Sequence, residues 1–189
     1  MLGEAKPKYL NSPEHVLFHK GNHLYNFHRA KSHIRKEKQV VLLEGYMDVM
    51  MAWQAGVHTG VASLGTALTH EQAKLVKKVA ETVVICYDAD FAGQSAALKG
   101  LDVLKKVHLG VKVAQMPSGL DPDDYIRQYG APSFKGDILA NALSLVQFKL
   151  ERLKHGYNLH DEDERLKYIL AAIHEITELP HAIEQDHYL

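Results

Sequence analysis

Five acidic side chains could act together although they lie far apart in the sequence. Each follows shortly after an apolar stretch that is typical of a buried strand: Glu44, Asp88, Asp90, Asp121 and Asp123. Crowded carboxylates repel one another, and a hard divalent cation relieves that repulsion. Because Mg²⁺ prefers few protein carboxylates and adds phosphate oxygens, the set indicates a phosphoryl or nucleotidyl substrate. We expect Mg²⁺ or Mn²⁺ here, and two ions could serve the attacking hydroxyl and the leaving pyrophosphate.

The local sequence favours presentation of these acids from fixed positions. In an extended segment residues i and i+2 point the same way, so Asp88 and Asp90 can share one cation. Pro122 disfavours the helical conformation at the residue before it, so Asp121 and Asp123 are expected on a fixed turn. Asp48 lies one turn into the helix that follows Glu44, and its side chain could hold the metal ligands in place. Each motif alone is also typical of a helix cap or a turn, and only their conjunction favours a metal site.

The elements that must position these acids alternate between strand and helix. Apolar runs bounded by turn residues predict strands at 40–44, 59–63, 82–88 and 111–116. Helical patterns separate them at 46–55, 70–80 and 94–108, and the last connection leads to a short helix or turn at 121–129. This alternation is typical of an α/β fold with a mostly parallel sheet flanked by helices. Parallel strands end at one edge, where such folds bind ligands.

The remainder of the chain differs in pattern and charge. From Pro132 onward the sequence predicts helices at 133–155, at 163–178 and after Pro180. Residues 1–38 hold eight Lys and Arg against three Asp and Glu, whereas residues 151–189 hold four against nine. A basic segment beside a carboxylate-bearing core suits an enzyme that handles nucleic acid or nucleotides, although a solvated basic face explains the charge equally well. No run reaches the roughly 18 apolar residues that a membrane span needs.

Four stretches carry a resemblance to a known family, in order and spacing: EGYMDVMMAWQAGV, ASLGTALT, VVICYDADFAGQSAA and LDPDD. They resemble the Toprim domain that DnaG-type primases share with topoisomerases and some nucleases. The upstream PKYLNSPEHVLFHKGNHLY, which lies outside the domain common to topoisomerases, resembles bacterial DnaG primases. The resemblance covers roughly residues 6–130. It implies a remnant of a basic N-terminal subdomain at 1–38, a Toprim domain at 39–130 and an all-helical subdomain at 131–189.

The same resemblance implies the RNA polymerase core of a DNA primase, which makes short RNA primers on single-stranded DNA by metal-dependent nucleotidyl transfer during DNA replication. It implies that Glu44, Asp88 and Asp90 bind the catalytic metals. Three further acids would line the site: Asp48, Asp121 and Asp123. Lys8 and Lys20 match lysines of the family's basic flank, which handles incoming nucleotide or the template–primer strands. The implied partners are the DNA template, the RNA primer and nucleoside triphosphates, for a cytoplasmic monomer without a membrane contact.

The sequence also departs from a complete primase of this type, which has a zinc-binding domain, a two-part polymerase core and a helicase-binding domain. Cys86 is the one cysteine, so zinc is expected only in a domain absent from this chain. We likewise expect the replicative helicase to bind through a region absent here, and the fragment to bind metal but to make primers poorly. The alternatives are another Toprim enzyme, such as a topoisomerase or nuclease, and a non-catalytic Toprim scaffold that binds DNA.

Overall fold

The computed structural model describes residues 14–16, 18–63, 67–87, 100, 103–179 and 181–189. At its centre is a sheet of five strands: β1 (Gln39–Leu43), β2 (Gly60–Ala62), β3 (Thr82–Ile85), β4 (Gly110–Val113) and β5 (Leu143–Ser144). The strand order is β2-β1-β3-β4-β5, in which β5 runs antiparallel to β4 and the other neighbours are parallel. The predicted α/β fold with a mostly parallel sheet is confirmed.

The parallel strands end level with one another. Leu42 of β1 pairs with Ile85 of β3, and Ile85 pairs with Val113 of β4. We call the side on which β1 to β4 end the carboxyl edge and the opposite side the amino edge. The chain leaves β1 toward β2 on one side and later returns to β3 on the other. The carboxyl ends of β1 and β3 therefore flank the point where the strand order reverses, which is where open α/β sheets bind ligands.

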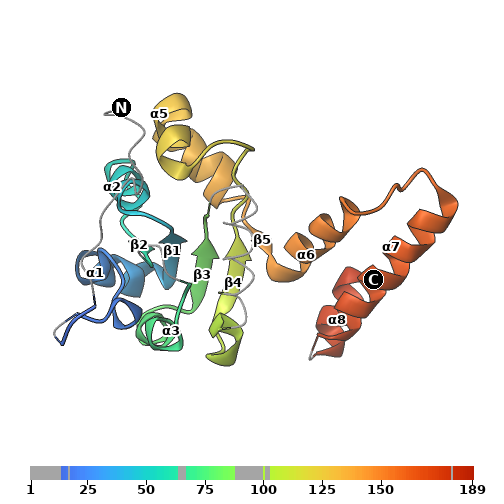
Figure 1. Ribbon diagram of the computed structural model, residues 1–189, viewed down its shortest axis with the longest axis horizontal. Helices are drawn as coiled ribbons and strands as arrows, with labels where there is room; N and C mark the ends of the chain where they lie inside the picture. The colour runs from blue at the N-terminus through green and yellow to red at the C-terminus, as the bar shows by residue number, and fades with distance from the viewer. Residues whose placement is uncertain (1–13, 17, 64–66, 88–99, 101–102, 180) are drawn as a thin grey trace.

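Two helical layers cover the sheet, one on each face (Figure 1). On one face, α1 (Phe27–Glu37) and α3 (His70–Lys77) bury apolar side chains against alternate residues of the strands, Val40 and Leu42 among them. On the other face, α2 (Tyr46–Gln54), α5 (Pro122–Ser133) and the π-helix η2 (Phe134–Leu139) pack against Val41 and Leu43. Burial on both faces explains why the strand sequences are continuous apolar runs.

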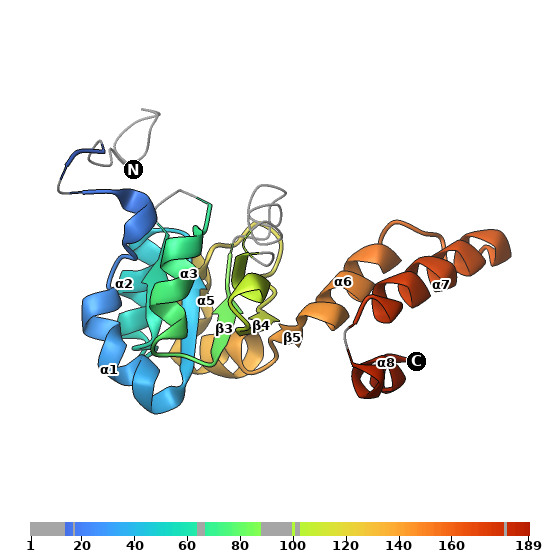
Figure 2. The same ribbon diagram turned by 90° about the horizontal axis from the view of Figure 1, so that it is seen from below.

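The C-terminal helices extend away from the sheet (Figure 2). They are α6 (Leu145–Lys154), α7 (Glu162–Thr177) and α8 (Ala182–Tyr188). The prediction of one helix over 133–155 is wrong, because β5 lies between η2 and α6 and pairs with β4. The domain boundaries at 38/39 and 130/131 stay predictions. None of the helices in the described part of the chain has the length and apolar character to cross a membrane.

Candidate functional site

Residues from three neighbouring strands meet at the carboxyl edge. Ser63 follows β2, Glu44 follows β1 and Tyr87 lies two residues beyond β3. Burial raises the pKa of the Tyr87 phenol well above its ordinary value, and the nearby Glu44 carboxylate raises it further, while a hydrogen bond with Ser63 opposes the rise. A buried, neutral tyrosine therefore lies next to a half-buried glutamate. The sequence prediction that Glu44 is delivered to this edge is matched by the backbone.

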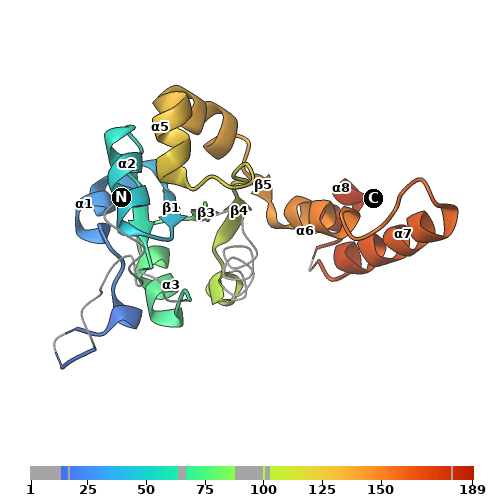
Figure 3. The ribbon, with the colours of Figure 1, turned by 45° about the horizontal axis from the view of Figure 1, so that its top comes forward.

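Asp48 connects the beginnings of two helices at the same edge. Its Oδ2 accepts a hydrogen bond from the Gly45 N–H at 3.0 Å, and only 8% of the residue is exposed. Burial raises the pKa of Asp48, and the carboxylates of Asp121 and Asp123 raise it further. Hydrogen bonds from the N–H groups of Gly45 and Asp123 oppose that rise. Asp48 therefore ties the start of α2 to the start of α5, and these two helices pack side by side (Figure 3).

Asp121 and Asp123 are presented at the N-terminus of α5. Asp121 is the N-cap, its Oδ1 accepts a hydrogen bond from the Asp124 N–H at 2.7 Å, and Pro122 occupies the first helical position. Pro at this position needs no N–H partner and fixes the turn. The Asp123 Oδ1 lies 2.8 Å from Nε of Arg127 one turn later. Both carboxylates thus already have a protein partner, which weakens their attraction for a further cation.

The remaining predicted ligands and one predicted lysine lie outside the described residues: Asp88, Asp90 and Lys8. Within the described ranges, no group of three His, Cys, Asp or Glu side chains is placed to hold a metal ion. Asp48, Asp121 and Asp123 are therefore together without forming a ready metal site by themselves. The metal site built on Glu44, Asp88 and Asp90 stays a prediction.

Lys20 begins the 3₁₀ turn η1 (Lys20–Asn22), whose backbone is held at both ends. The Lys20 N–H donates to Glu14 Oε1 at 2.8 Å. The Nε2 group of Gln72 donates to the carbonyls of Lys20 at 3.0 Å and His23 at 2.7 Å. Gln72 is fully buried, and its Oε1 accepts from the Thr69 N–H at the start of α3. This one side chain anchors the basic segment to the start of α3.

Sequence reasoning missed this second role of Gln72. The stretch Thr69–Gln72 predicts a capping box, and the structure confirms it, with Thr69 Oγ1 accepting from the Gln72 N–H at 3.1 Å. The capping box accounts for the glutamine completely at the level of sequence. A sequence signal for the bonds to Lys20 and His23 does not exist, because those partners lie about 50 residues upstream.

Three families match consecutive parts of the chain. Residues 1–31 match the family described as the DNA primase catalytic core, N-terminal domain. Residues 41–126 match the Toprim-like family. Residues 146–189 match the family described as the DnaB-helicase binding domain of primase. The last match contradicts the prediction that a helicase-binding region is absent from this chain; the all-helical pattern of the tail gives no local motif by which sequence reasoning could have found it.

Whole-chain comparisons point to the same group of proteins. The chain is 53% identical over 188 residues to the DNA primase of Halalkalibacterium halodurans and 47% identical over 189 residues to that of Geobacillus stearothermophilus. It covers about 31% of the length of each. Among solved structures, the RNA polymerase domain of Mycobacterium tuberculosis primase DnaG in complex with double-stranded DNA aligns with a TM-score of 0.86 at 29% identity. That alignment covers 98% of this chain and 60% of the other.

A DNA primase domain from Pseudomonas aeruginosa aligns with a TM-score of 0.78 at 30% identity, over 99% of this chain and 59% of the other. A structure described as the DnaG catalytic core covers 99% of this chain as well, so most of the helical tail aligns within a catalytic core. The matches therefore agree over the whole length of the chain, from the basic segment to α8. The chain belongs to the bacterial DNA primase family, in which it corresponds to a Toprim-containing segment of the catalytic core.

Proposed function

We propose that this chain is the metal-binding part of a DNA primase, a DNA-directed RNA polymerase that makes short RNA primers on single-stranded DNA. The observation that carries the proposal is the level ending of β1 and β3. Glu44 follows β1, and its charge acts on Tyr87, the residue that directly precedes Asp88 in the sequence. Neighbouring parallel strands thus support a shared site for Glu44 and the Asp88/Asp90 pair.

The acidic residues of the site fall into two groups, those that would bind metal and those that would hold the neighbouring helices in place. We assign Glu44, Asp88 and Asp90 as oxygen donors to Mg²⁺ or Mn²⁺, whose hard character matches carboxylates. Asp48, Asp121 and Asp123 have protein hydrogen-bond partners or an ion pair, and we assign them to holding α2 and α5 together beside the site. Bound metal would polarise phosphate oxygens and lower the pKa of an attacking hydroxyl.

Lys8 and Lys20 would add positive charge next to the site. Each lysine would act as a point charge on a phosphate of incoming nucleotide or of the template–primer strands. Gln72 holds the backbone of Lys20 in place. The Lys20 ammonium would therefore be more restricted in position than it would be on a free loop.

The partners follow from the relatives. One solved relative is described as a DnaG primase catalytic domain bound to single-stranded DNA, at 32% identity and a TM-score of 0.77. We propose single-stranded DNA and nucleoside triphosphates as ligands of this chain within its complete protein in the cytoplasm. The match of residues 146–189 supports a replicative helicase as a partner of the tail. We expect the isolated chain to synthesise primers poorly, since it spans about 31% of the length of the Halalkalibacterium halodurans primase.

The test is a chimera in which this chain replaces its counterpart in the Halalkalibacterium halodurans primase, followed by an assay of RNA primer synthesis on single-stranded DNA with Mg²⁺. We expect synthesis by the chimera and a loss of about 100-fold or more in its Glu44→Gln variant, because a carboxylate ligand is removed from the reaction centre. The matched control is Glu162→Gln, an exposed glutamate in the first turn of α7, which should leave synthesis unchanged. A folded chimera that nicks supercoiled DNA but makes no RNA would contradict the proposal and favour a nuclease or topoisomerase.

A further inference from the structure

Three segments meet at the amino edge of the sheet, and the two that precede β1 and β3 bring basic side chains together there. Gln39, Thr82 and Gly110 pair in register at the beginning of β1, β3 and β4. The segments that precede these strands are joined by backbone hydrogen bonds, from the Glu81 N–H to the Lys38 carbonyl at 2.8 Å and from the Gly110 N–H to the Glu81 carbonyl at 2.9 Å. Whatever side chains these segments carry must therefore lie close together.

Four of those side chains line one surface pocket of about 420 Å³, together with Val79, Ala80 and Glu81. We call these four the amino-edge patch: Arg35, Lys38, Lys77 and Lys78. All four are exposed. Glu81 is the one acid in the lining, and its carboxylate lies 3.8 Å from the Lys38 ammonium in a pair that is exposed on both sides. An ion pair of that kind is weak, so it offsets little of the positive charge.

Helix dipoles account for only part of this arrangement. α1 and α3 both end at the amino edge, and basic residues are favourable at helix C-termini. Lys77 has a further structural contact, since its ammonium donates to the carbonyl of His108 at 2.7 Å. One or two cations are nevertheless enough to interact favourably with the dipole of each helix. Bringing two such helix ends together adds like-charge repulsion that stability alone does not require.

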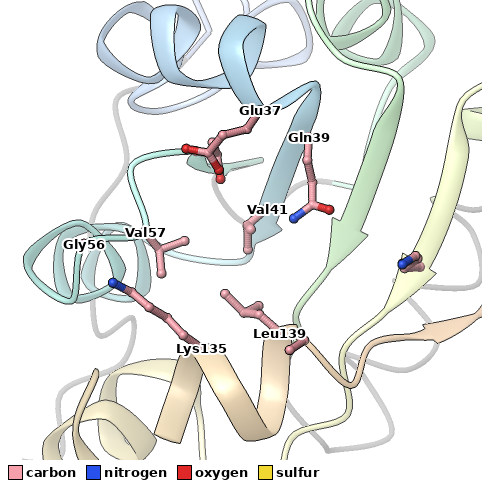
Figure 4. Close-up of a pocket in the computed structure, with 10 residues that line it drawn as sticks. Glu37, Gln39, Val41, Gly56, Val57, Lys135 and Leu139 are labelled. Carbon is pink, nitrogen blue, oxygen red and sulfur yellow. The ribbon is translucent and has the colours of Figure 1, made fainter. Parts of the chain in front are cut away.

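A second cavity at the amino edge, of about 380 Å³, provides a contrast (Figure 4). It lies on the face covered by α2 and η2, and Glu37, Val41, Val57 and Leu139 are among its lining residues. Its Lys135 ammonium lies against Gly56 at the end of α2, only 2.7 Å from where a β-carbon on that glycine would be. This cavity therefore mixes acidic, basic and apolar groups, whereas the amino-edge patch is cationic without an exposed apolar centre.

We infer that the amino-edge patch binds the phosphate backbone of nucleic acid, at a site separate from the carboxyl edge. Clustered Lys and Arg bind phosphates without needing apolar contact. A docking protein would instead need an apolar centre, and Val79 and Ala80, the apolar residues of the lining, are buried. Nucleic acid held there would lie on the opposite side of the sheet from Glu44. The inference depends on the charge layout and not on primase chemistry.

The test is fluorescence anisotropy of a labelled 20-nucleotide oligo(dT) with the complete 189-residue chain, in EDTA, between 50 and 300 mM NaCl. EDTA separates this binding from metal-dependent binding at the carboxyl edge, so failure here leaves the proposed function intact. The variant Arg35→Gln/Lys77→Gln/Lys78→Gln should weaken binding about tenfold. It should also reduce the slope of log K against log salt by about 2, at roughly 0.7 per lost phosphate contact.

The matched control removes three charges from the tail: Lys154→Gln/Arg165→Gln/Lys167→Gln. It should leave both affinity and slope nearly unchanged. Lys77→Glu/Lys78→Glu, on α3 alone, provides a second variant if the triple variant unfolds, and it should weaken binding more strongly than tenfold. Equal losses in patch and tail variants, or an unchanged slope in the patch variants, would overturn the inference. So would patch-dependent binding of poly-glutamate without patch-dependent binding of oligo(dT).

Discussion

The two edges of the sheet collect opposite charges for the same geometric reason. Parallel strands place every segment that follows a strand at the carboxyl edge and every segment that precedes one at the amino edge. Helices begin at the first edge and end at the second, so dipoles favour acids at one and bases at the other. The difference lies in burial, because Asp48 is 8% exposed whereas the amino-edge patch is exposed throughout. Burial raises the pKa of Asp48 and hydrogen bonds from backbone N–H groups oppose that rise, whereas exposed bases are free to bind a polyanion.

The largest effect should come from a substitution that damages both edges at once. Leu42 is 2% exposed near the end of β1, and Leu42→Ala would leave a cavity beneath α1 and α3. We expect the free energy of unfolding to fall by about 2–5 kcal/mol, as measured by urea denaturation. Leu170→Ala on α7, where the leucine is 61% exposed, is the control and should change it by no more than about 0.5 kcal/mol. Similar losses of unfolding free energy in both variants would show that the core of the sheet does not contribute more to stability than the surface of α7.

A smaller and local effect should follow from Gln72→Ala, which acts near the carboxyl edge only. The substitution removes the hydrogen bonds from the Gln72 amide to the partly buried carbonyls of Lys20 and His23, and it removes the acceptor of the Thr69 N–H. We expect a loss of about 1–3 kcal/mol in the free energy of unfolding, together with faster amide exchange in residues 20–23. Gln185→Ala is a matched control, because Gln185 also donates to two carbonyls but lies in α8, which has no buried residue. If exchange in residues 20–23 stayed unchanged, Gln72 would not anchor the basic segment.

The smallest effect on stability should come from Arg127→Ala. This variant tests whether Asp123 contributes to metal binding or only helps to hold α2 and α5 together. The Arg127–Asp123 pair is half exposed on the arginine side, so its loss should cost less than about 1 kcal/mol. Because the positive charge of Arg127 would no longer oppose a cation near Asp123, Mn²⁺ affinity should rise about two- to fivefold in a titration followed by electron paramagnetic resonance. The control Arg165→Ala, on α7, should leave affinity unchanged. A fall in affinity in Arg127→Ala would show that the arginine supports the metal site in another way.

The sequence was sufficient for the strands with strong local patterns. β1, β3 and β4 are apolar runs bounded by glycine or polar residues, and each lies within two or three residues of its predicted range. The N-cap role of Asp121 and the capping box at Thr69 were also readable, since both depend on neighbours within three residues. These features are local, and local chemistry determines them.

Features that depend on distant partners could not be read in this way. β5 has only two residues and is defined by its pairing with β4. Its sequence gives no strand pattern of its own, so it was included in a predicted helix. The bonds of Gln72 to the basic segment and the pairing of Asp48 with the start of α5 likewise join segments about 50 to 75 residues apart. For the candidate site, sequence reasoning brought Glu44, Asp48, Asp121 and Asp123 to one edge, but it could not tell that Asp48 joins the starts of α2 and α5 or that Asp123 pairs with Arg127.

The most direct test of the central claim is anomalous diffraction from crystals of the chain soaked in Mn²⁺. The account predicts a manganese peak at the carboxyl edge, within roughly 2–2.5 Å of a Glu44 carboxylate oxygen and of an oxygen from Asp88 or Asp90. Manganese bound without Glu44, or Glu44 and the two aspartates on different sides of the molecule, would contradict it.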